Sequence, residues 1–206
     1  MTRSFCHYGS IPSDMMDIIE EDLNKNFDHL MQVSRLMGNK EILERRNSKN
    51  AWVPTTYWLG GLMWHYFKKV NDEFFNYNLD CIDGESMQYT HYGLNQKYDW
   101  HQDEGINSLY KPQSSGNRND NMILQDFMTN EVKKNRKLTC ILQLANEEDY
   151  EGGDTQVRDI DNTMITLSKK RGTLFFFDSR LQHRAMKVKK GLRKSLIIWA
   201  VGPRWK

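Results

Sequence analysis

Residues 92–103 read YGLNQKYDWHQD, and the end of this stretch carries the residue types of a metal site. His101 and Asp103 stand two positions apart in a segment with the texture of a strand. Side chains two apart in an extended chain point to the same side. The imidazole and the carboxylate could therefore bind one metal ion. The pair alone is weak evidence, because a surface turn with the same two residues is the competing interpretation.

A third ligand for the same ion has to come from another strand. His183 follows a predicted strand at 172–177 and a turn at 178–180, which is a suitable position at the end of a sheet. Two imidazoles and one carboxylate on one face of an octahedron leave three positions open, which is typical of non-haem Fe(II) oxygenases. Zinc hydrolases also commonly use three protein ligands, so the three residues do not identify the metal.

Arg193 begins the last strong strand pattern of the chain, at 193–199. Arg193, Ser195, Ile197 and Trp199 share one face of that strand by alternation. An arginine directed into an apolar barrel needs an anion, because an unpaired buried charge is very costly. A carboxylate pairs with the guanidinium in two places, so the far carboxylate of 2-oxoglutarate would fit. The alternative is a surface arginine in the basic run at 187–193.

Short apolar or alternating segments, separated by glycine or Asn-Asp turns, follow one another from about residue 81. They predict strands at 87–92, 138–144, 155–157, 164–167, 173–177 and 195–201. Many short strands with such turns favour a mainly β fold with a double-stranded β-helix, or jelly-roll, core. Apolar residues at helical spacing predict two helices before it, which begin near Ser13 and Thr55.

The length of 206 residues suits a single domain, 1–206. We predict a helical N-terminal support at 1–78, packed on a jelly-roll catalytic core at 79–206. A long polar loop at 104–136 interrupts the core. Loops of this length inside a compact domain are either functional lids or disordered, and we predict that this one closes over the substrate.

Charge, apolar runs and cysteine content argue against several classes of protein. Lys plus Arg number 29 and Asp plus Glu 27, so the formal charge of +2 gives no reason to expect a nucleic acid or a membrane as partner. The chain has neither the pattern of a signal peptide nor an apolar run long enough to span a membrane. Three scattered cysteines do not suggest a disulfide scaffold. We therefore expect a cytoplasmic location; the sequence does not indicate an oligomeric state.

Taken together, the motifs resemble the prolyl 4-hydroxylase-like (PKHD-type) branch of the 2-oxoglutarate/Fe(II)-dependent dioxygenases. Residues 92–103 resemble the stretch with the first two metal ligands, and 150–155 (YEGGDT) resemble the family's Gly-Gly turn. Residues 172–179 with His183 resemble its strand and distal histidine, and 191–195 (GLRKS) its arginine motif. Four motifs in the right order over about residues 71–202 form a specific match, whereas residues 1–50 match only loosely.

The resemblance implies Fe(II) bound by His101, Asp103 and His183, and 2-oxoglutarate as co-substrate, with ascorbate as a candidate reductant. It implies that Arg193 binds the tail of 2-oxoglutarate and that Tyr92, Thr139 and Ser195 add contacts. Tyr98, Trp100 and Trp199 are the candidates for the substrate pocket, although core packing explains the first two equally well. The expected reaction uses dioxygen to hydroxylate a C–H bond, most simply of a prolyl residue in a protein or peptide, and releases succinate and CO2.

Three alternatives stay open from the sequence. The first is oxidation of a free amino acid or another small molecule. The second is nucleic-acid dealkylation, which would want a second arginine on the strand face where Trp199 stands. The third is a cupin-like binding module without this chemistry or with another metal.

Overall fold

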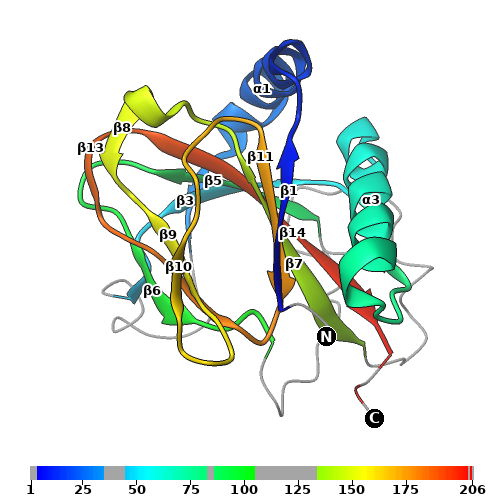
Figure 1. Ribbon diagram of the computed structural model, residues 1–206. Coiled ribbons are helices and arrows are strands. Elements are labelled where there is room, and N and C mark those ends of the chain that lie inside the picture. The colour runs from blue at the N-terminus through cyan, green and yellow to red at the C-terminus, as the bar shows by residue number, and fades with distance from the viewer. Residues whose placement is uncertain (1–3, 35–44, 83–85, 105–133, 204, 206) are drawn as a thin grey trace.

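The computed structural model describes residues 4–34, 45–82, 86–104, 134–203 and 205. Its two longer helices are α1 (Ser13–Phe27) and α3 (Trp58–Val70). Three shorter helical segments are η1 (Asp28–Leu30), the π-helical η2 (Asn71–Phe75) and η4 (Glu147–Asp149). The other elements named within the described residues are β-strands, which form two facing sheets and a small two-stranded ribbon (Figure 1).

Eight strands of the described chain form the larger sheet. In spatial order they are β1 (Phe5–Ser10), β11 (Thr173–Asp178), β7 (Asn135–Gln143), β14 (Arg193–Gly202), β5 (Met87–Tyr92), β3 (Lys49–Val53) and β2 (Gln32–Val33), and β4 (Cys81–Ile82) pairs with β14. Neighbours in this order pair antiparallel. The strand β14 lies between β7 and β5, so its side chains reach the middle of the molecule.

The smaller sheet carries the two candidate histidine ligands. Its strands, in order, are β10 (Met164–Thr166), β9 (Thr155–Arg158), β12 (Gln182–Ala185) and β6 (Tyr98–His101). The two-stranded ribbon pairs β13 (Val188–Gly191) with β8 (Tyr150–Gly152). The mainly β fold predicted from the sequence is confirmed, with two antiparallel sheets of the jelly-roll type.

The helices cover the outer face of the larger sheet. α1 buries Met16, Ile19, Leu23 and Phe27, and α3 buries Leu59, Met63, Phe67 and Val70. In each case the buried side chains recur every three to four residues, so they form one apolar stripe. Both stripes belong to the core cluster that includes residues of β7 and β14. The helices therefore support the sheet without entering the space between the sheets (Figure 1).

Strand alternation separates this core from the interior of the sandwich. On β14, Leu196 and Ile198 join the helix-side core, whereas Ile197 packs with a second cluster that includes Val157 of the smaller sheet. Arg193, Ser195 and Trp199 alternate with the helix-side residues, so they lie on the face of Ile197. The predicted shared face of this strand is thus present in the structure.

The N-terminal part differs in one respect from the sequence-based expectation. Residues 1–78 were expected to be a helical support, but the structure adds β1, β2 and β3, which are three strands of the larger sheet. The pairing of β1 with β11 and of β3 with β5 is long-range, and no local turn pattern indicates it. The lid predicted at 104–136 falls almost wholly outside the described residues. No helix within the described ranges has the length and apolarity needed to cross a membrane.

A conformational requirement at Gly191 gives a test of the fold. Gly191 has φ of +76°, and a Cβ there would lie 1.9 Å from the carbonyl oxygen of Asp149. We expect Gly191→Ala to lower the free energy of unfolding by about 2–4 kcal/mol, measured by denaturant unfolding. Gly61 in α3 has nothing within 4 Å of the same position, so Gly61→Ala should raise stability by about 0.5–1 kcal/mol. Equal stability of Gly191→Ala and the parent chain would contradict the backbone conformation at Gly191 and its close approach to Asp149.

Candidate active site

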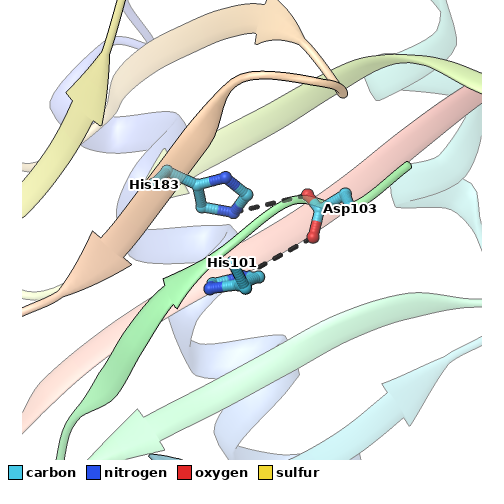
Figure 2. A group of neighbouring side chains, drawn as sticks. All are labelled: His101, Asp103 and His183. Atoms are coloured by element: carbon cyan, nitrogen blue, oxygen red, sulfur yellow. Dashed lines mark ion pairs between the residues drawn. The ribbon is translucent and has the colours of Figure 1, made fainter. Parts of the chain in front are cut away.

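His101, Asp103 and His183 come together between the sheets (Figure 2). His101 ends β6 and is the register partner of His183 on β12, so pairing of the strands places both imidazoles side by side. Asp103 follows two residues after His101. One ligand atom from each residue lies within 4.8 Å of the other two, which suits a single divalent metal ion.

The hydrogen bonds of the imidazoles direct their remaining nitrogens at the carboxylate. Nδ1 of His101 lies 2.8 Å from the carbonyl oxygen of Asp99, and Nδ1 of His183 lies 3.1 Å from that of Leu181. A carbonyl oxygen only accepts, so Nδ1 of each ring donates and Nε2 is the nitrogen left to bind a metal ion. The two Nε2 atoms face Asp103 oxygens at 3.6 and 3.5 Å. Lone pairs that face a carboxylate in this way call for a cation between them.

The Asp103 carboxylate is held in place from the opposite sheet. Its Oδ2 accepts hydrogen bonds from Thr139 Oγ1 and Trp199 Nε1, both at 2.8 Å. Burial raises the pKa of the carboxyl, but His183, His101, Arg136 and the Trp199 hydrogen bond outweigh it, and the net shift is downward. The group is therefore an anion at neutral pH, with Oδ1 free of these two donors.

His101 is neutral over the same pH range. Burial and the neighbouring His183 lower its pKa to about 3. The Tyr98 ring stacks on it with centroids 3.5 Å apart and planes 14° apart. Tyr98 also packs against a cluster that contains Tyr92 and Tyr150, so it lies between the histidines and the next feature of the site.

Arg193 is a buried cation beside that cluster. The residue is 3% exposed, its Nη2 donates to Thr155 Oγ1 at 2.7 Å, and its guanidinium lies 5.2 Å from the centre of the Tyr92 ring. Tyr150 is a further hydrogen-bond partner. Among the described residues no carboxylate forms an ion pair with it. A buried arginine without a counter-ion is costly, so these surroundings suit an anionic ligand.

Two further residues lie beside Arg193. Ser195, two residues along β14 on the same face, is fully buried, and its hydroxyl has no hydrogen-bond partner in the described structure. Gly153 has φ of +63°, and a Cβ there would lie 3.2 Å from Cδ of Arg193 and 3.1 Å from the Tyr150 ring. The glycine thus leaves room for the arginine, while the free hydroxyl fits an added carboxylate oxygen.

The structure assigns different surroundings to the other predicted residues. The Tyr92 ring lies against Arg193, and the Tyr98 ring lies against His101. Thr139, predicted to contact 2-oxoglutarate, bonds Asp103 and lies 3.0 Å from Ser179 Oγ. Trp199, predicted only as a pocket residue, donates to the Asp103 carboxylate.

Trp100 has different neighbours from those of His101. It alternates with His101 on β6 and packs with Arg158 and Arg184, whose guanidinium carbons lie 4.8 and 4.5 Å from its ring centre. Arg184 likewise alternates with His183 on β12, so these side chains leave the other face of the smaller sheet. These contacts do not support Trp100 as a residue of the substrate pocket.

Arg46 was not predicted from the sequence as a residue near the site. The residue is 8% exposed, its guanidinium carbon lies 4.6 Å from the centre of the Tyr98 ring, and its Nε donates to Ser48 Oγ at 3.1 Å. Its Nη2 is buried without a hydrogen-bond partner. An arginine in a charged, polar stretch gives no sign of burial in the sequence alone, so only the tertiary structure reveals it.

Fold and site together define a class of protein. Two antiparallel sheets enclose two histidines and one carboxylate, and the larger sheet also carries a buried arginine, Arg193. This ligand set leaves coordination positions open, as in the non-haem iron proteins that bind a co-substrate at the metal.

Comparison with known proteins identifies the family within that class. Residues 87–201 match the family model of the 2OG-Fe(II) oxygenase superfamily, which covers more than half of the chain. The chain belongs to this superfamily, and the family implies Fe(II) and 2-oxoglutarate. The membership predicted from the four motifs is confirmed. A search of curated protein sequences gives no match.

Several solved structures share the fold at low sequence identity. A Pseudomonas putida prolyl-4-hydroxylase superposes with a TM-score of 0.69 at 14% identity, over 99% of this chain and 95% of that one. A Trichoplax adhaerens prolyl hydroxylase, in complex with a hypoxia inducible factor peptide fragment, gives 0.70 at 16%, over 97% and 84%. A viral collagen prolyl hydroxylase from Paramecium Bursaria Chlorella virus-1 gives 0.60 at 18%, over 97% of each chain.

Proposed function

We propose that this oxygenase hydroxylates a C–H bond of a prolyl residue in a protein or peptide and converts 2-oxoglutarate to succinate and CO2. The observation that carries the oxygenase chemistry is a His–Asp–His cluster together with a buried arginine that has no carboxylate partner among the described residues. The prolyl substrate is supported by the likeness to structures of prolyl hydroxylases, at 14–18% identity.

Different residues of the chain would bind the metal and the co-substrate. His101, Asp103 and His183 would hold Fe(II), with the Nδ1 hydrogen bonds to backbone carbonyls fixing the rings. Arg193 and the free Ser195 hydroxyl would bind the far carboxylate of 2-oxoglutarate. When bound, the metal and the co-substrate would supply the oxidising power for inserting one atom of dioxygen into the substrate.

A buried donor close to the histidines is suited to hold a substrate by one of its oxygens. The unpartnered Nη2 of Arg46 lies next to Tyr98, which stacks on His101. A guanidinium N–H of this kind needs an acceptor, which a peptide carbonyl or a substrate carboxylate would provide. Arg46 and Tyr98 would thus hold the substrate residue beside the metal.

The proposal is tested with proline-containing peptides in the presence of Fe(II), ascorbate and 2-oxoglutarate. Succinate release and the gain of one oxygen atom by the peptide, both dependent on a proline in the sequence, are expected. Hydroxylation of free proline or another free amino acid, with no turnover of any peptide, would instead favour the small-molecule substrate.

Arg46→Met is expected to raise the KM for the peptide by about 10-fold or more, because it removes a charged hydrogen-bond donor but keeps an apolar stem. The KM for 2-oxoglutarate in uncoupled turnover without peptide should stay unchanged. The matched control is Arg45→Met, since Arg45 is exposed and its Nη2 donates to the Trp100 carbonyl. An unchanged peptide KM in Arg46→Met would remove Arg46 from the substrate site.

A further inference from the structure

The turn between β11 and β12 fixes the backbone of the proposed metal ligand Asp103. The carbonyl oxygen of Ser179 accepts hydrogen bonds from the backbone N–H groups of Asp103 and Glu104, both at 3.0 Å. The Ser179 hydroxyl also lies 3.0 Å from Thr139 Oγ1, which donates to the Asp103 carboxylate. One short turn therefore contacts Asp103 through its main chain and, by way of Thr139, through its side chain.

Asp178 and Arg180 hold this turn rigid from within. One Asp178 oxygen accepts from the backbone N–H and from Nε of Arg180, both at 2.9 Å, and the other accepts from Nη2 at 2.6 Å. Tyr77 adds a donor to the same carboxylate at 2.7 Å. Asp178 is 4% exposed, so its carboxylate is shielded from water. Ser179 lies between Asp178 and Arg180 in the chain, so the ion pair of these two residues holds the Ser179 carbonyl in place.

Trp205, near the end of the chain, packs against this pair. The Arg180 guanidinium carbon lies 3.9 Å and the Lys137 Nζ 3.3 Å from the centre of its indole ring. Tyr77 meets the same ring edge-on at 5.1 Å. Lys137 is only 4% exposed, and its ammonium group lies over the face of the indole in a cation–π contact.

We propose that Asp178, Arg180, Lys137 and Trp205 form a clamp that positions Asp103 for metal binding through the Ser179 carbonyl. They are positioning residues, since none of them contacts the three ligands directly. A metal site tolerates only small displacements of its ligands, so loosening this turn lowers metal affinity even when the ligands remain. The inference rests on the proposed metal site, and it adds the C-terminal tryptophan and a buried lysine to what that site requires.

Cobalt(II), whose visible absorption reports coordination geometry, tests the clamp without any substrate. Apo-protein with the full chain is titrated with Co(II) alone. We expect Arg180→Gln and Trp205→Leu each to bind Co(II) about 10- to 100-fold more weakly than the parent chain and to shift its visible bands. Trp205→Phe keeps an aromatic ring between the two cations and should restore binding to within about 3-fold.

Arg171→Gln is the matched control for general destabilisation. Arg171 also pairs with two carboxylates, Asp17 at 2.8 Å and Glu20 at 2.9 Å. Both partners lie on α1, and neither contacts Asp103 or the Ser179 turn. Arg171→Gln should lower the thermal unfolding midpoint as Arg180→Gln does, yet leave the Co(II) affinity and spectrum unchanged.

Parental Co(II) affinity and spectrum in both Arg180→Gln and Trp205→Leu would overturn the clamp. The same result would follow if Arg171→Gln weakened Co(II) binding as much as Arg180→Gln. Failure of the metal site itself looks different: Co(II) would then bind Asp103→Asn as tightly as the parent chain, and the inference would fall with the site.

Discussion

Asp103→Asn is expected to reduce 2-oxoglutarate turnover by more than about 100-fold and to abolish stoichiometric Fe(II) binding, because changes around metal ligands already cost 10- to 100-fold. Asparagine keeps an acceptor for Thr139 and Trp199, so the local packing survives. What is lost is the negative charge that faces the Nε2 atoms of His101 and His183. Bound iron per chain and succinate release are the two measurements.

Asp99→Asn supplies the control in the same segment. Its carboxylate is half-exposed and pairs with Lys97 at 3.3 Å, and only its backbone carbonyl reaches His101. The amide side chain leaves that carbonyl in place, so iron content and turnover should equal those of the parent chain. Iron bound at full stoichiometry by Asp103→Asn would exclude this carboxylate as a ligand.

Arg193→Ala is expected to raise the KM for 2-oxoglutarate by about 10- to 100-fold, since a charge-assisted hydrogen bond contributes about 1.5–3 kcal/mol. Its effect on the maximal rate should be much smaller, because the arginine lies in a separate pocket with Thr155 and Tyr92 and not at the histidines. The KM of Arg193→Lys for 2-oxoglutarate should lie between those of the parent chain and Arg193→Ala, because lysine keeps the charge but lacks the planar guanidinium group. Initial rates over a range of 2-oxoglutarate concentrations measure all three.

Lys194 provides a neighbouring cation on the opposite face of β14. Its Nζ lies 3.4 Å from Glu20 and 3.1 Å from the Asn24 side-chain oxygen, both on α1. Lys194→Ala removes the same charge from the next residue along the strand, so its KM for 2-oxoglutarate should not change. A KM in Arg193→Ala equal to that of the parent chain would show that another group binds the co-substrate.

Local patterns predicted the central strands because side-chain alternation and turn residues can be recognised within a few consecutive residues. The strand expected at 87–92 coincides with β5, and 173–177 differs from β11 by one residue. β1 and β3 were missed, since each pairs with a strand distant in sequence and neither has a clear turn beside it. Such pairing depends on tertiary contacts that no short pattern contains.

In the candidate site, too, local features could be predicted from the sequence and tertiary contacts could not. The spacing of His101 and Asp103, and the alternation that places Arg193 with Ser195, are local properties, and the structure brings these residues together as expected. Partners across the interior were not predictable. The hydrogen bond from Trp199 to Asp103 joins residues 96 positions apart, so it follows from how the two sheets face each other.

An anaerobic titration of the apo-protein with Fe(II), followed by 2-oxoglutarate, tests the central claim most directly. We predict a weak visible charge-transfer band that is absent in His183→Ala and that needs more 2-oxoglutarate in Arg193→Ala. Absence of the band in the parent chain, with zinc bound more tightly than iron, would contradict this assignment of cluster and pocket. It would point to a differently metallated protein on the same fold.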